Sequence, residues 1–175
     1  MAKYLFISDA HGDRDILTQI FTANKDQVTQ IFYNGDSELP ANDEVFDDVI
    51  TVAGNMDFDR KYELTNHYQT KEQSIFQTHG HLLGVNYSLT KLILAAKAVN
   101  AQIVTFGHTH QLGVEVADNM LIINPGSISQ PRGKYAHLGG TYAIVTVDAS
   151  TYDVQYYNRA MVAIPDLHFI FNLSE

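Results

Sequence analysis

The chain has 175 residues, of which 45% are hydrophobic, and we expect residues 1–175 to form a single domain around one core. It contains no cysteine, which excludes disulfides and thiolate metal sites. The net charge is −9 and the Lys and Arg residues are scattered, which argues against binding to extended nucleic acid.

The first apolar run, residues 4–8, predicts a strand. It ends at Asp9 and is shorter than the apolar segment of a signal peptide. No apolar stretch approaches the roughly 20 residues that cross a bilayer. We therefore expect a cytoplasmic protein that does not enter membranes.

Strand-like and helix-like segments alternate over the first two-thirds of the chain. A helix is predicted at residues 13–24, because the apolar residues from Ile16 to Phe21 recur at helical spacing. A short helix is predicted at 42–48, and a longer one begins near Ser88, a capping residue, and ends at Asn100. The other strands predicted in this part are residues 31–34, 49–53, 74–78 and 103–106.

After residue 110 the pattern predicts strands without long helices between them. The strands are 120–123, 141–147 and 153–157, and a turn-rich loop occupies 124–140. The tail at 163–175 alternates apolar side chains from Leu167 to Leu173 with its other residues, which predicts one more strand. This strand would add to the edge of its own sheet or contact a second subunit, so a homodimer or larger homo-oligomer is one expectation.

The order of these elements predicts the fold class. Alternating strands and helices favour a parallel sheet, and the later strands favour a second, more antiparallel sheet packed on the first. With helices on the outer faces, the two sheets would form an α/β sandwich. Ligands of such folds gather outside the carboxyl ends of the strands.

Five of the predicted strands end in residues that can bind a metal. The motifs are Asp9-Ala10-His11, Gly35-Asp36, Gly54-Asn55-Met56-Asp57, Thr78-His79-Gly80-His81 and Gly107-His108-Thr109-His110. One polar residue at a strand end is ordinary, because strands end where loops begin. Five in succession predict convergence on one site.

The candidate ligands supply only oxygen and imidazole nitrogen. They are Asp9, His11, Asp36, Asn55, His79, His108 and His110. Such a set suits manganese, which we expect, or iron, zinc, nickel or cobalt. Seven ligands are too many for one catalytic ion, but they suit two ions about 3.5–4 Å apart that clamp the attacking and leaving oxygens of an in-line displacement. Hydrolysis of a phosphate ester is the reaction that this arrangement favours.

In order and separation, these motifs resemble the calcineurin-like metallophosphoesterases, and most closely their small single-domain branch, the YfcE-like phosphodiesterases. The resemblance extends from Lys3 to about Asn158 and includes the loop residues 124–127 and 131–133. It implies the calcineurin-like four-layer sandwich, in which two mixed β-sheets pack together and are flanked by helices. It also implies two divalent ions per chain and a small phosphoester substrate.

The resemblance further implies a role for each ligand. The first ion would be held by Asp9, His11 and His110. The second ion would be held by Asn55, His79 and His108, which makes Asn55 a catalytic residue as well. Asp36 would bridge the two ions, and a metal-bound hydroxide between them would attack the phosphate ester in line.

One position departs from the family. Many members have a histidine between the asparagine and the acidic residue of the third motif, where it protonates the leaving group or stabilises the transition state, but this chain has Met56. The proton would then come from Asp57, His81, a metal-bound water or no group at all. Because a positioned acid contributes about 10²–10⁴-fold, we expect modest turnover, strongest on activated phosphodiesters such as aryl esters.

The sequence leaves two possible roles open for each of three further residues. His79 precedes a glycine, as the family ligand does, so His81 is either a substrate-side residue or a structural one. Arg132 either binds a phosphate oxygen or is a solvent-exposed loop residue. Asn124 either orients a metal ligand or belongs only to an Asn-Pro-Gly turn.

Two classes of function remain open. The first is a dinuclear metal-dependent phosphoesterase, most simply a phosphodiesterase. The second is a non-catalytic or weakly catalytic scaffold of the same fold that binds other proteins, as the retromer subunit Vps29 does. Seven converging polar side chains cost desolvation when no metal is bound, so the complete ligand set favours the enzyme. A nuclease that acts on short substrates is a third possibility.

Overall fold

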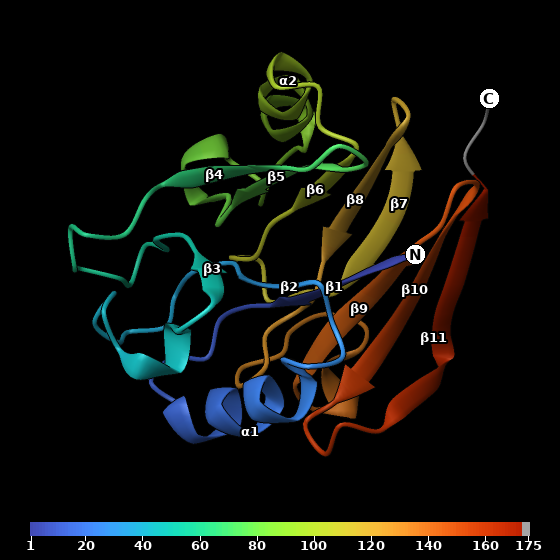
Figure 1. Ribbon diagram of the computed structural model, residues 1–175. Coiled ribbons are helices and arrows are strands. Elements are labelled where there is room, and N and C mark those ends of the chain that lie inside the picture. The colour runs from blue at the N-terminus through green and yellow to red at the C-terminus, as the bar shows by residue number, and fades with distance from the viewer. Residues whose placement is uncertain (173–175) are drawn as a thin grey trace.

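The computed structural model describes residues 1–172 and has two β-sheets packed face to face between helices (Figure 1). The six-stranded sheet has the order β11-β10-β9-β1-β2-β3, and the five-stranded sheet has the order β4-β5-β6-β8-β7. From one outer face to the other, the layers are α1, the six-stranded sheet, the five-stranded sheet and α2. The predicted four-layer α/β sandwich with two mixed sheets is therefore confirmed.

The six-stranded sheet has a parallel half and an antiparallel half. The parallel strands are β1 (Ala2–Ile7), β2 (Gln30–Tyr33) and β3 (Val49–Thr51). The antiparallel strands are β9 (Thr141–Val147), β10 (Thr151–Asn158) and β11 (Ala163–Asn172), with β9 beside β1. Along β1, Tyr4 and Phe6 face the other sheet while Leu5 and Ile7 face α1, as the two-residue period of a strand requires.

The five-stranded sheet has a parallel centre and antiparallel edges. Its centre consists of β5 (Ser74–Thr78), β6 (Ile103–Thr105) and β8 (Met120–Asn124). Its edges are β4 (Thr65–Gln69) and β7 (Gly113–Ala117). The expectation that the early strands form one parallel sheet and the later strands another is wrong, because each sheet combines early and late strands. Strand and helix alternation identifies parallel units but does not specify the sheet that each unit joins.

The two edge strands of the smaller sheet were not among the predicted elements. Strand β4 has the sequence TNHYQ, which contains no apolar run, and its residues alternate between exposed and partly buried positions. Strand β7 begins at Gly113 and has no fully buried residue. An edge strand that buries little surface leaves little hydrophobic pattern to recognise.

Two α-helices cover the outer faces of the sheets. Helix α1 (Arg14–Asn24) packs Ile16, Leu17 and Ile20 on the six-stranded sheet, and the Asp13 side chain caps it by accepting from the Ile16 N–H at 3.2 Å. Helix α2 (Thr90–Ala98) covers the five-stranded sheet. The helix begins two residues after Ser88, whose hydroxyl accepts from the Thr90 N–H at 3.1 Å.

The remaining helical segments are single 3₁₀ turns. They are η1 (Glu44–Phe46), η2 (His81–Leu83) and η3 (Ala136–Leu138). Within residues 1–172, no helix has both the length and the apolar character needed to cross a membrane.

Strand β11 forms the outer edge of the six-stranded sheet along β10 (Figure 1). Its Leu167 is buried between the sheets, and Phe169 packs edge-on against Tyr156. Residues 173–175 of the predicted tail, including Leu173, lie outside the described residues. A subunit contact through this strand stays a prediction.

Candidate metal centre

The loops that follow five parallel strands converge on one site. These strands are β1, β2 and β3 of one sheet and β5 and β6 of the other. The seven predicted ligands lie on these loops: Asp9, His11, Asp36, Asn55, His79, His108 and His110. Two groups among them, Asp9–His11–His110 and Asp9–Asp36–His79, place one ligand atom from each residue within 4.8 Å of the others. The convergence occurs at the carboxyl ends of strands from both sheets.

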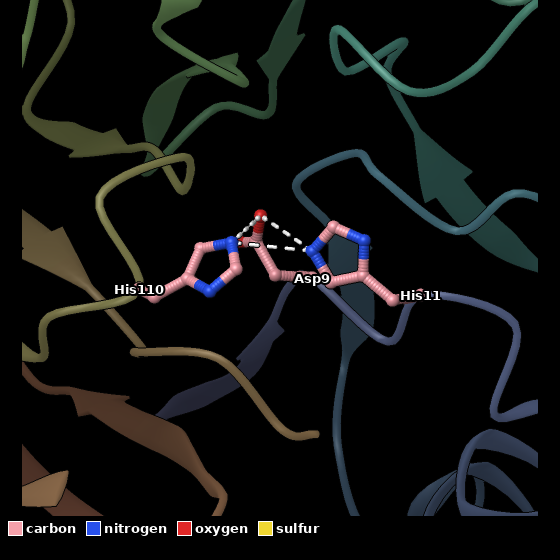
Figure 2. A group of neighbouring side chains, drawn as sticks. All are labelled: Asp9, His11 and His110. Carbon is pink, nitrogen blue, oxygen red and sulfur yellow. Dashed lines mark hydrogen bonds and ion pairs between the residues drawn. The ribbon is translucent and has the colours of Figure 1, made fainter. Parts of the chain in front are cut away.

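In the first group, Asp9 lies between two imidazoles (Figure 2). Its Oδ1 atom is 3.3 Å from Nε2 of His110 and 3.9 Å from Nε2 of His11. The two Nε2 atoms are 3.2 Å apart. Because Asp9 and His11 follow β1 whereas His110 follows β6, this group joins the two sheets.

The second group continues from Asp9 through His79. Nε2 of His79 is 3.3 Å from Oδ2 of Asp36 and 4.0 Å from Oδ1 of Asp9. The Asn55 Oδ1 atom is 3.1 Å from Nε2 of His79 and 2.8 Å from Nδ1 of His108. All seven predicted ligands therefore form one connected set of contacts, in which His79 links Asp9, Asp36 and Asn55.

Hydrogen bonds at Nδ1 orient three of the four histidines. The pairs are His79 with the carbonyl oxygen of Asn34 (2.7 Å), His110 with the carbonyl oxygen of Gln130 (2.7 Å) and His11 with the carboxylate of Glu38 (2.8 Å). These oxygens only accept, so each Nδ1 carries the hydrogen and each Nε2 presents its lone pair to the site. Two of the acceptors are backbone atoms, which have no signature in the sequence.

This orientation makes lone pairs face one another. In the neutral histidines, Nε2 of His11 and Nε2 of His110 lie 3.9 Å and 3.3 Å from Oδ1 of Asp9 and 3.2 Å from each other, with no hydrogen to share. Oδ1 of Asp9 is buried and has no hydrogen-bond donor among the described residues. An unpartnered buried carboxylate oxygen is costly, whereas a divalent cation would satisfy all three atoms. The residues present therefore fit the predicted metal centre.

The carboxylates shift the pKa values of the histidines beside them. Burial alone would lower the pKa of His79 and of His110, but their protonated rings would bond to Asp36 and to Asp9 respectively, which outweighs burial, and both pKa values are raised. Burial would raise the pKa of Asp36, but the interaction with His79 outweighs it and the pKa is lowered. The pKa of His108 is lowered, first by burial and then by the charge of His79. The surroundings of Asp36, His79 and His110 thus favour their charged forms, whereas those of His108 favour its neutral form.

Five of the seven candidate ligands have a left-handed backbone. Their φ angles are +57° for Asp9, +46° for His11, +56° for Asp36, +66° for His108 and +59° for His110. Residues with a Cβ atom seldom adopt this region, at a cost of about 1–3 kcal/mol each. Such conformations cluster at binding and active sites, where the surrounding structure enforces them.

Glycines precede the ligands because loops cross here at short range. A Cβ atom on Gly107 would overlap the hydroxyl of Ser8 and lie 2.7 Å from Oδ2 of Asp9. A Cβ atom on Gly54 would overlap the carboxylate of Asp36. In these two motifs the glycine therefore lets the next ligand approach a ligand from another strand.

Buried polar residues beneath the ligands hold the two sheets together. The Asn34 side chain, at the end of β2, donates to the hydroxyl of Thr105 at 2.6 Å and accepts from Nε2 of Gln77 at 3.1 Å. Both partners belong to the five-stranded sheet. Because the Asn34 carbonyl also accepts from His79, these bonds fix a candidate ligand relative to both sheets.

Asn124 both supports the loop of two candidate ligands and forms a turn, the two roles that the sequence left open. Its Nδ2 atom donates to the carbonyl oxygen of Gly107 at 3.0 Å and to the hydroxyl of Thr109 at 3.1 Å, which fixes the loop that carries His108 and His110. Its Oδ1 atom accepts from the Gly126 N–H at 2.9 Å and thereby forms the turn. The nearby Ser127 hydroxyl donates to the carbonyl oxygen of Asp9 at 2.7 Å, a support that the sequence does not signal.

The two proposed proton donors lie in different surroundings. The Asp57 carboxylate accepts five hydrogen bonds, four from backbone N–H groups and one from the Ser37 hydroxyl, at 2.7–3.1 Å. It holds the Asp36 and Asn55 loops together, and its oxygens are fully engaged. His81 lies beside the second group, with its ring centre 5.3 Å from that of His79. Its buried Nδ1 atom has no hydrogen-bond partner among the described residues.

A cleft of about 340 Å³ opens over the ligands. Its lining residues are His11, Asp36, Glu38, Asn55, Met56, His108, His110, Gln130 and Arg132. The Met56 side chain is 39% exposed, and its backbone N–H donates to Oδ1 of Asp36 at 2.7 Å. Arg132 is solvent-exposed and also lines the cleft. An exposed loop position therefore does not prevent this side chain from reaching a phosphate in the cleft.

Replacing Glu38 with glutamine is expected to weaken the binding of one metal ion by about 10–100-fold, because the carboxylate that orients His11 at 2.8 Å would lose its charge. Isothermal titration with Mn²⁺ measures this effect. Glu72→Gln, at an exposed residue of the β4–β5 turn, is the matched control. Equal affinities in Glu38→Gln and the wild type would contradict the assigned role.

The sandwich and its converging Asp, Asn and His side chains define a candidate metal-dependent enzyme, and sequence comparison identifies the family. Residues 3–150 match the calcineurin-like phosphoesterase superfamily domain, and the chain belongs to this superfamily. The probable metallophosphoesterase YsnB of Bacillus subtilis is 36% identical over 165 residues, which cover 93% of this chain and 95% of YsnB. The phosphodiesterase YfcE of Escherichia coli K12 is 28% identical over 159 residues, which cover 76% of this chain and 83% of YfcE. The resemblance of the motifs to this family is thus confirmed.

Solved structures agree with this assignment. A predicted phosphoesterase from Streptococcus pneumoniae TIGR4 superposes with a TM-score of 0.94 at 34% identity, covering 98% of this chain and 97% of that one. Vps29 from Cryptosporidium parvum superposes with a TM-score of 0.71 at 16% identity, covering 99% of this chain and 98% of that one. At 16% identity, the similarity to Vps29 shows only that the two proteins share a fold.

Proposed function

We propose that this protein is a dinuclear metal-dependent phosphoesterase that hydrolyses a small phosphoester, most simply a phosphodiester. The observation that carries the proposal is the buried, unpartnered Oδ1 atom of Asp9, on which the lone pairs of His11 and His110 converge. Hydrolysis of a phosphoester needs positive charge where the phosphate binds, and a cation at this point would supply it. Membership of the phosphoesterase superfamily supports the same reaction.

In this proposal the seven ligands divide into two sets joined by a carboxylate. One set is Asp9, His11 and His110. The other set is Asn55, His79 and His108. Asp36 serves both sets, since it contacts His79 directly and lies in a group with Asp9. When bound, two divalent ions would supply the positive charge that activates a water molecule and neutralises the phosphate, which is the chemistry that an in-line displacement at phosphorus requires.

A residue of the cleft would position the ester, and a residue beside the ligands would supply the proton. Arg132 would bind a phosphate oxygen, because a guanidinium group donates two parallel hydrogen bonds to such groups. Met56 lines the cleft but has no proton to give. With the oxygens of Asp57 engaged by five donors, His81 would protonate the leaving group, but only weakly, because burial lowers its pKa and it is not among the residues that line the cleft.

Removal of metal is expected to abolish hydrolysis. Purified protein treated with EDTA and dialysed should not cleave bis-p-nitrophenyl phosphate, and Mn²⁺ should restore cleavage, because the imidazoles around Asp9 do not lower the pKa of a water molecule as a divalent ion does. Release of p-nitrophenolate measures the rate, and Zn²⁺, Ni²⁺, Co²⁺ and Fe²⁺ provide the comparison. Undiminished hydrolysis after chelation, or none with any of these ions, would remove the proposal.

Three further assignments rest on the sequence. We propose manganese as the native ion, a cytoplasmic location and a single-domain chain. The alternative of a protein-binding scaffold has the fold likeness to Vps29 in its favour, but no feature of the site supports it over the enzyme. A scaffold has no need for a buried carboxylate oxygen, Oδ1 of Asp9, that lacks a hydrogen-bond donor among the described residues.

A further inference from the structure

Tyr33 lies beneath two of the ligand loops and touches both. It is the last residue of β2, pairs with Ile7 of β1 and is fully buried, with its ring centre 5.4 Å from that of Phe46. Its hydroxyl accepts from the Ala10 N–H at 2.9 Å and donates to the carbonyl oxygen of Asp36 at 3.1 Å. Because a phenol can accept and donate at once, this one group joins the loop after β1 to the loop after β2.

The same two loops also pair through their backbones, except at Ala10. Three N–H groups of residues 9–12 donate to carbonyl oxygens of residues 35–37: Asp9 to Gly35 (3.1 Å), His11 to Asp36 (3.0 Å) and Gly12 to Ser37 (2.9 Å). The fourth N–H, that of Ala10, donates to the Tyr33 hydroxyl instead. Tyr33 therefore supplies from its side chain the acceptor that completes the pairing of two ligand-bearing loops.

The peptide group between Asp9 and Ala10 is fixed at both ends. Its carbonyl oxygen accepts from the Ser127 hydroxyl at 2.7 Å, and its N–H donates to Tyr33. Asp9 has a φ angle of +57°, which residues with a Cβ atom seldom adopt, so the position of its carboxylate depends on the bonds that hold this peptide. Without the Tyr33 hydroxyl, the fully buried Ala10 N–H would lose its acceptor, which favours rotation of the peptide and relaxation of Asp9.

Asp36 is held independently of Tyr33. The Asp57 carboxylate accepts from the Asp36 N–H at 2.7 Å, and the Asp36 carboxylate accepts from the Met56 N–H at 2.7 Å. The contact of Asp36 with His79, at 3.3 Å, is to a ligand of the second set. Loss of the Tyr33 hydroxyl should therefore displace the loop after β1 and leave Asp36 with the ligands of the second ion.

We infer that Tyr33 is a positioning residue for the metal centre, whose buried hydroxyl sets the position of Asp9 and His11 relative to Asp36. Tyr33 is not itself a ligand, and it acts through the backbone of Ala10. The inference rests on the proposed two-ion centre and adds that the affinity of its first position depends on a tyrosine in the core.

Isothermal titration of the EDTA-treated protein with Mn²⁺ tests the effect on affinity. The wild type should bind two ions. Tyr33→Phe, which removes only the hydroxyl, should bind one of them about 10–100-fold more weakly and the other with wild-type affinity. Tyr142→Phe is the matched control, because Tyr142 is buried in the same apolar cluster and its hydroxyl bonds to Asn24 at the end of α1. This control should bind both ions as the wild type does.

Hydrogen exchange of the Ala10 amide in the metal-free protein, followed by NMR, tests the contact itself. In Tyr33→Phe this amide should exchange at least about 10-fold faster than in the wild type, because its acceptor is gone. The amides of β1 and β2 should keep their rates, and so should Ala10 in Tyr142→Phe. A general loosening of the core would instead speed exchange along both strands.

These measurements separate the role of Tyr33 from the two-ion centre. Two ions bound with wild-type affinity by Tyr33→Phe overturn the positioning role and leave the centre intact. The role is also overturned if Tyr142→Phe weakens binding as much as Tyr33→Phe does, or if exchange at Ala10 is unchanged in Tyr33→Phe. A wild type that binds one ion or none overturns the two-ion centre and this inference with it.

Discussion

Replacing Asp36 with asparagine is expected to lower Mn²⁺-dependent cleavage of bis-p-nitrophenyl phosphate by at least about 10³-fold, equivalent to about 4 kcal/mol of transition-state stabilisation. Asparagine keeps the shape of the side chain and an oxygen that accepts from the Met56 N–H, a bond of 2.7 Å in the native protein. It loses the charge that lies 3.3 Å from Nε2 of His79, between the two ligand sets. Initial rates over a series of Mn²⁺ concentrations separate lost affinity from lost turnover.

The Asp36→Asn variant also has a pH signature in the metal-free protein. The pKa of His79 is raised, so its contribution to stability is present below its ordinary value of 6.5 and is lost as pH rises through the raised value. The pKa of Asp36 is lowered, so its contribution is present above 3.8 and is lost as pH falls through the lowered value. Urea unfolding in EDTA should therefore show a larger loss of stability in the variant at pH 6 than at pH 9.

Asp26→Asn provides the matched control, because Asp26 is an exposed residue beyond the end of α1. It should retain activity and lose no stability at either pH. In the wild type, Mn²⁺ at about 100 times its dissociation constant should raise the free energy of unfolding by about 2.7 kcal/mol. An Asp36→Asn protein that is fully active, or that gains as much stability from Mn²⁺ as the wild type does, would contradict the bridging role.

The elements that bury an apolar face were predictable from the sequence. Helix α1 and strands β1, β2 and β9 have a strong hydrophobic pattern, a helical period in α1 and an apolar run in the strands, because each packs on the core. Strands β4 and β7 lie at sheet edges and lack it. The partition of the strands between two sheets was not predictable, because it depends on which pairs form between residues far apart in sequence, such as Leu5 with Ile144.

The candidate ligands were predictable because they follow strands in a recurring pattern, whereas the groups that orient them were not. His79 is oriented by the backbone of Asn34 and His110 by the backbone of Gln130, and any residue type supplies a backbone carbonyl. Glu38 lies only two residues after Asp36, but nothing in its type or spacing indicates that it turns toward His11. Such contacts follow from the left-handed loop conformations, which a sequence pattern does not reveal outside glycine.

Replacing Met56 with histidine is expected to raise turnover of phosphodiesters that have poor leaving groups, such as alkyl esters, by about 10²-fold or more. The side chain lines the cleft and is 39% exposed, so an imidazole fits without burial. Only the backbone N–H of residue 56 bonds to Asp36, and this bond survives the substitution. The gain should be smaller for bis-p-nitrophenyl phosphate, because p-nitrophenolate leaves without a proton.

The dependence of rate on leaving-group pKa distinguishes proton donation from other effects of a substitution at Met56. It should be shallower in Met56→His than in the wild type, because a proton donor relieves charge on the departing oxygen. Met56→Gln supplies hydrogen bonds without a transferable proton and Met56→Leu supplies only volume, so both should keep the wild-type dependence. If all three variants behave alike, the missing acid does not limit this enzyme. If only Met56→His gains activity on poor leaving groups, the metal site is complete and the absent proton is what restricts its substrates.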